Sequence, residues 1–101
     1  MRITLIVSDN AVYIGNRTAS VDLSALADSY RAVQWQERTE GVGHVEMLDG
    51  ENRPLDANGF TEFSAYVESA EAIFAAEDEA ARQQQEAQAA LDALAAQVAQ
   101  Q

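Results

Sequence analysis

The feature that most constrains this chain is its last stretch, residues 61–101, which contains neither glycine nor proline and is dominated by alanine, glutamate and glutamine. These residue types favour the α-helix, so we predict one helix of roughly 40 residues, about 60 Å long at 1.5 Å per residue. A domain of 60 residues has a radius of gyration of only about 10 Å. We therefore expect a small β-rich domain over residues 1–60 and a helix over residues 61–101, of which the first part docks on the sheet and the rest projects.

The first 60 residues contain short alternating segments separated by turn residues. Residues 2–7 and 11–14, with a turn of Asp and Asn between them, are typical of a β-hairpin. In residues 31–37, Val33 and Trp35 lie two apart and share one strand face, which we expect to point into the core.

Three more segments complete the predicted sheet and its connections. Strands are predicted over residues 18–23 and 44–48, with a turn at residues 40–43 before the second of them. Residues 24–30 fit either a loop or a helical turn, and residues 51–59 are predicted to form a connector. The predicted class is α+β: a small, mainly antiparallel sheet followed by one long C-terminal helix, in part a coiled coil.

The two parts of the predicted helix carry different apolar patterns. Near its start the apolar residues form a wide stripe, the width expected where a helix lies on a sheet. We therefore predict a core of Val33, Trp35, Phe63, Tyr66, Val67, Ile73 and Phe74. Trp35, the only tryptophan, fits either a core side chain beneath the helix or a platform for a ligand or partner.

The far part of the helix continues as a heptad-like seam that is polar in its middle and apolar at its end. The predicted residues for contact with a partner or with a second copy are Ala80, Ala87, Leu91, Leu94 and Val98. Two alternatives remain open at this point: a solvated alanine-rich helix that frays, and a helical hairpin that turns near residues 83–85, where no helix breaker is present.

Charge and composition exclude several classes of function. Of the 17 acidic residues, nine lie in residues 1–60 with five of the six arginines, and eight lie in residues 61–101 with Arg82 alone. Because nucleic acids and anionic membranes are bound through Lys and Arg, we expect no nucleic-acid and no membrane partner. The acidity fits solubility or a docking face for a basic partner. With no export signal or membrane span recognised, we expect a soluble, cytosolic protein.

The sequence offers few parts for catalysis or metal binding. It has no cysteine, and His44 is its single histidine, so hydrolytic triads and zinc sites lack components. The acidic segment at residues 49–53 is not a calcium loop, because Pro54 and Phe60 stand where that loop needs glycine and glutamate. We predict no enzymatic activity, no catalytic residue, no cofactor and no metal.

Three segments carry a resemblance to a known group of proteins: AVQW at 32–35, GHVE at 43–46 and DGENRP at 49–54. They resemble segments of small proteins encoded beside tail-fibre genes in tailed bacteriophages, and the likeness covers roughly residues 1–60. The resemblance implies a tail-fibre assembly factor or chaperone that binds the tail-fibre protein, or a structural protein retained in the virion tail as a minor component. The resemblance also implies a location in the host cytoplasm or in the virion tail. Independently of the resemblance, we expect a homo-oligomer, because so small a domain has a marginal core.

Overall fold

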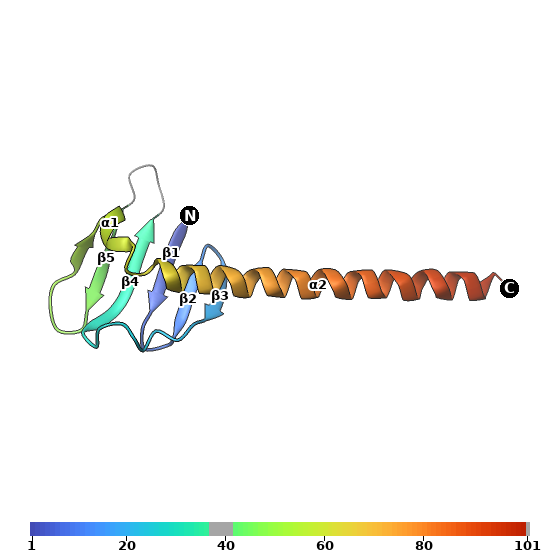
Figure 1. The fold of residues 1–101 in the computed structure, drawn as a ribbon, viewed down its shortest axis with the longest axis horizontal. Helices are drawn as coiled ribbons and strands as arrows, with labels where there is room; N and C mark the ends of the chain where they lie inside the picture. The colour runs from blue at the N-terminus through green and yellow to red at the C-terminus, as the bar shows by residue number, and fades with distance from the viewer. Residues whose placement is uncertain (37–41, 101) are drawn as a thin grey trace. The chain divides into compact units, whose positions relative to one another are not determined.

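The fold was analysed in a computed structural model, which describes residues 1–36 and 42–100. Six strands form one antiparallel sheet in the order β3-β2-β1-β4-β5-β6, and two helices follow them (Figure 1). The strands are β1 (Arg2–Ile6), β2 (Ala11–Ile14), β3 (Arg17–Ser20), β4 (Tyr30–Gln36), β5 (Val42–Met47) and β6 (Arg53–Leu55). The helices are α1 (Ala57–Phe60) and α2 (Ser64–Ala99). The predicted α+β class is confirmed.

The two central strands of the sheet, β1 and β4, are not consecutive in the sequence. β1 pairs with its hairpin partner β2 on one side and with β4 on the other, so that Leu5 lies between Val12 and Val33. All three side chains are fully buried, which makes them the middle of the core. Because successive side chains of a strand point to opposite faces, Thr4, Gln34 and their neighbours lie on the other face of the sheet.

The connection from β3 to β4 is held in place by one turn residue. Asn10 has a positive φ of 48°, a left-handed conformation that Asn tolerates better than most residues. Its carbonyl accepts from the Val21 amide and its side-chain Oδ1 accepts from the Leu23 amide, both at 2.9 Å. Because Asn10 holds this segment, Leu23 is fully buried although it lies outside any strand.

The structure differs from the sequence-based boundaries in residues 51–63. The predicted connector contains β6 and α1, and Asp56 caps α1 by accepting from the Gly59 amide at 2.7 Å. The long helix begins at Ser64 rather than at residue 61, because residues 61–63 form a turn after α1. The chain divides into two compact units at residue 71, eleven residues beyond the predicted boundary: residues 1–71 and residues 72–101.

Other boundaries differ by a few residues. β3 ends at Ser20, short of the predicted residue 23, and β5 begins at Val42, inside the predicted turn. The rest of that turn, residues 40–41, lies outside the described residues. Residues 24–25 form a turn, and Asp22 accepts from the Ser24 amide at 2.9 Å.

Candidate functional site

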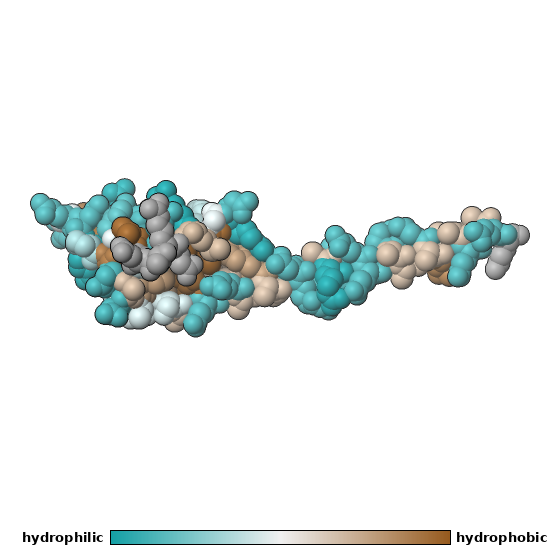
Figure 2. All heavy atoms as spheres, turned by 90° about the horizontal axis from the view of Figure 1, so that it is seen from above, coloured by the Kyte–Doolittle hydropathy of each residue, from teal (hydrophilic) through white to brown (hydrophobic). Residues whose placement is uncertain are grey.

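The far part of α2 is an uncovered surface in the described chain. Every residue from 75 to 100 is exposed, whereas the residues at the start of the helix include buried Val67 and Ala70. Leu91, Leu94 and Val98 are 60%, 57% and 64% exposed. Figure 2 shows the same contrast along the helix, where a hydrophilic middle is followed by a more hydrophobic end. Three large apolar side chains on a single helix without a cover are a candidate interaction surface.

The predicted contact residues lie together on this surface. In a helix, residues three and four apart share a face, and the spacing of Ala80, Ala87, Leu91, Leu94 and Val98 follows that rule, with one step of seven between the alanines. All five are exposed and helical, and their contact with a partner or a second copy stays a prediction. A turn near residues 83–85 is excluded, because α2 continues from Ser64 to Ala99 without a break.

A charged cluster marks the hydrophilic middle of α2. Arg82 donates to Glu79 from Nε at 3.0 Å and also contacts Glu86, one helical turn further on. The hydrogen bond from Arg82 holds the pKa of the Glu79 carboxyl below its usual value, and the bond to Glu79 raises the pKa of Arg82. These groups are solvent-exposed, so the contacts support the helix locally and are screened by salt.

The uncovered face of the sheet is a second, polar surface. One row of cross-strand neighbours crosses all six strands on this face: Thr18, Tyr13, Thr4, Gln34, His44 and Pro54. Gln34 Oε1 accepts from Thr4 Oγ1 at 2.8 Å and from Arg2 Nη2 at 3.1 Å, and His44 Nε2 lies 3.5 Å from Glu46 Oε1. This face can exchange hydrogen bonds with a polar partner.

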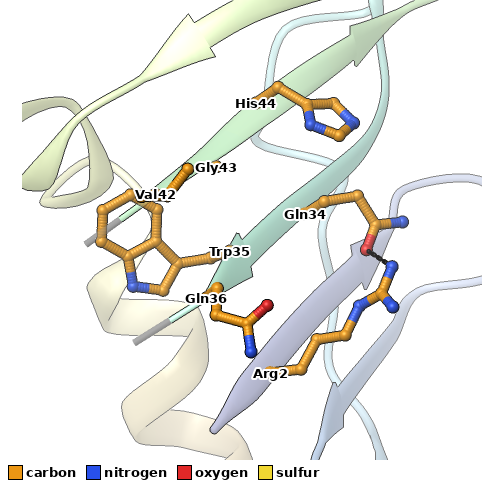
Figure 3. A pocket seen from close by; sticks show the side chains of 7 residues that line it. All are labelled: Arg2, Gln34, Trp35, Gln36, Val42, Gly43 and His44. Carbon is orange, nitrogen blue, oxygen red and sulfur yellow. Dashed lines mark hydrogen bonds between the residues drawn. The ribbon is translucent and has the colours of Figure 1, made fainter. Parts of the chain in front are cut away.

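A shallow pocket of about 330 Å³ lies at one end of this sheet. Figure 3 shows Arg2, Gln34 and His44 on one side of the strands and the Trp35 ring on the other. Gly43 lies opposite Trp35 in the neighbouring strand. A Cβ added to Gly43 would lie 2.2 Å from the Gln34 carbonyl oxygen and 2.7 Å from Trp35 Cε3, so only glycine fits this close approach.

Trp35 is a core residue, and the structure identifies its principal aromatic partner. The Trp35 and Phe60 rings stack with centroids 4.4 Å apart and an angle of 5° between their planes. Trp35 is 5% exposed and Phe63 is fully buried. The sequence predicted a position for Trp35 beneath the long helix, whereas its stacking partner Phe60 lies in the separate short helix α1, which was not predicted. Asp56 is a preferred N-cap residue, and this sequence signal could have indicated a separate short helix that begins after it.

The other predicted core residues fall into two groups. Val33, Val67 and Phe74 are buried, in agreement with the prediction. Tyr66 and Ile73 were also predicted in the core, and the structure shows them half-buried. The buried residues in α2 and in the turn before it have the spacing 63, 67, 70 and 74, which leaves Tyr66 and Ile73 at the margin of that stripe.

A polar cluster missed by sequence reasoning joins β4, β6 and the turn before α2. Arg53 Nη2 donates to the Tyr30 hydroxyl at 3.0 Å, and that hydroxyl donates to the Glu62 carboxylate at 3.3 Å. Arg53 also lies over the Tyr30 ring, 5.2 Å from its centroid. The Arg53 and Glu62 side chains are each 49% exposed, so they do not form a buried charged site. The cluster connects β4, β6 and the turn before α2 at the surface.

Within the described part of the chain, no group of three or more His, Cys, Asp or Glu residues is arranged to hold a metal ion. No described helix combines the length and the apolar character that a membrane span requires. Comparison of the chain with protein-family models, with curated proteins and with solved structures finds no match.

Proposed function

We propose that this chain is a bacteriophage tail-fibre assembly factor or chaperone that acts by protein–protein binding, in the host cytoplasm. The single observation that carries the binding role is the exposure of residues 75–100 of α2, including three large apolar side chains. The tail fibre as partner comes from the resemblance of residues 32–35, 43–46 and 49–54.

The physical basis of such a role is the protection of unfinished fibre chains. A fibre that must intertwine its chains exposes apolar surface and unpaired strand edges before it closes, and such surfaces aggregate. The end of α2 offers Leu91, Leu94 and Val98 to apolar surface, while the chain's net charge of −11 keeps the resulting complex dispersed.

The experiment is coexpression of this chain with the tail-fibre protein encoded beside it. The full chain should raise the yield of soluble, SDS-resistant fibre trimer, and a chain truncated after residue 75 should give no gain. The variant L91E/L94E should also lose the gain, whereas A89E/A96E, which adds the same charge on the opposite face of α2, should keep it. Equal fibre yield with and without the full chain would refute the chaperone role.

The second candidate is a structural protein that stays in the virion tail, and it depends on the same uncovered helix. Mass spectrometry of purified particles separates the two functions. A chaperone is absent from mature particles or present far below one copy per fibre, whereas a structural component is present in a fixed ratio to the fibre.

A further inference from the structure

From residue 78 onward, the charged residues of α2 are segregated to one side of the helix. With Leu91 and Val98 at heptad position a and Leu94 at d, positions a, d, e and g from Ala80 to Val98 hold only Ala, Gln, Leu and Val. The charged residues between 78 and 100 all fall at b, c or f: Asp78, Glu79, Arg82, Glu86 and Asp92. We call positions a, d, e and g of residues 80–98 the uncharged face.

This layout discriminates among possible occupants of the uncharged face. A basic helix would be attracted by acids at e and g, where this chain has alanine and glutamine. A membrane surface would require Lys or Arg on the polar side, which here carries four acids and one arginine. A second copy of the chain meets neither problem, because its acids point outward when the two uncharged faces are in contact.

The side-chain sizes on this face favour one orientation. In an antiparallel pair centred between Leu91 and Leu94, each Leu91 packs on the partner copy's Leu94, and each Ala87 packs on its Val98. Every layer then combines one large with one small side chain or two leucines, which fills the space evenly. A parallel pair would instead stack Ala87 on Ala87 and Val98 on Val98.

Charge and dipole favour the same orientation. A parallel, in-register pair continues towards Glu77, which stands at position a and would face its own copy. The antiparallel pair leaves Glu77 outside the overlap, and it places the two helix dipoles in opposite directions. We propose that residues 87–98 of two copies associate as an antiparallel, two-fold symmetric coiled coil through the uncharged face.

This inference goes beyond the proposed function, because it concerns the chain alone and requires no fibre protein. Since the dimer buries the same Leu91, Leu94 and Val98 that would meet a fibre, dimerisation and fibre binding compete for one face. An overlap of about three helical turns is short, so the area that it buries should not exceed the lower limit of about 1,200 Å² for stable, specific interfaces. The dimer should therefore depend on concentration, with a dissociation constant on the order of micromolar.

The first test measures mass against concentration for the purified full chain. Sedimentation velocity from about 1 to 500 μM should show a shift from monomer to dimer, spanning the expected constant. L91E/L94E should weaken the dimer at least tenfold, and A89E/A96E should leave its dissociation constant within about twofold. A monomer throughout this range, a larger oligomer, or equal loss in both double variants would overturn the proposal.

The second test measures orientation, using the absence of cysteine in the chain. A87C and V98C are oxidised separately and as a mixture, and disulfide-linked dimers are identified by mass spectrometry. Antiparallel packing predicts an A87C–V98C disulfide in the mixture and little crosslinking of either variant alone, since a disulfide needs Cα atoms within about 7 Å. Efficient homodisulfides in each separate variant would show parallel packing and overturn the proposed orientation.

Discussion

The two units of this chain are stabilised in different ways. Residues 1–71 contain all the buried hydrophobic residues identified in the structure except Phe74, and their sheet joins strands from distant parts of the sequence. The second unit is helical from residue 72 to Ala99, and side-chain hydrogen bonds join residues three or four apart along it, such as Gln88 to Asp92 at 3.0 Å. The first unit depends on tertiary packing, and the second depends on helix propensity and local pairs.

This difference predicts where substitutions are costly. A cooperative core transmits the loss of one side chain to the whole unit, whereas an exposed helix loses only local contacts. The following substitutions test that contrast, from the largest expected effect to the smallest.

Trp35→Ala should have the largest effect. It removes the partner of the Phe60 ring and leaves a cavity in the core, so the free energy of unfolding should fall by about 3–5 kcal/mol, enough to unfold so small a unit. Leu91→Ala is the comparison in the second unit, and it should leave the unfolding midpoint of the sheet unchanged. Because Trp35→Ala removes the only tryptophan, unfolding of the sheet unit is measured in all variants by amide hydrogen exchange of its strands. If amide hydrogen exchange shows that the Trp35→Ala variant unfolds at the same temperature as the wild type, the packing described here is contradicted.

Gly43→Ala should have a smaller but clear effect. The added methyl group meets the Gln34 carbonyl and the Trp35 ring, so β4 and β5 must separate or the ring must move. Overpacking of this kind lowers the free energy of unfolding by about 1–3 kcal/mol.

Gly50→Ala is the matched control for that substitution. Nothing lies within 4 Å of a Cβ added at Gly50, so the same change of residue type should alter stability by no more than about 0.5 kcal/mol. Urea unfolding of the two variants provides the comparison. Equal midpoints would show that Gly43 is not packed against Trp35.

Glu79→Gln should have the smallest effect, confined to the helical unit and dependent on pH. The bond to Arg82 lowers the pKa of Glu79, so the charged carboxylate supports the helix above its ordinary pKa of 4.5. That support is lost as the pH falls through the lowered value. Helix content measured by far-ultraviolet circular dichroism should be slightly higher in the wild type at pH 7, and the difference should vanish in acid. A difference that persists in acid, where Glu79 is protonated, would exclude this ion pair as its cause.

Sequence reasoning performed best where structure is local. β2 was predicted with its observed bounds and β1 to within one residue, because alternation and an Asp–Asn turn are readable from neighbouring residues. The burial of Val33 and Trp35 followed from the same alternation. The five predicted contact residues of α2 are exposed on one face, since helical spacing alone determines which residues share it.

The tertiary structure decided the features that depend on distant residues. The pairing of β1 with β4, the stacking of Trp35 on Phe60 and the Arg53–Tyr30–Glu62 cluster join segments that are 20 to 30 or more residues apart. Such contacts have no local periodicity, because they depend on how the sheet closes and where the chain returns to it. The sequence by itself determined a β-rich first part and a helical end, since both follow from residue type and spacing. Only the packed structure determined that the long helix starts at Ser64, after a short capped helix has placed Phe60 on the tryptophan.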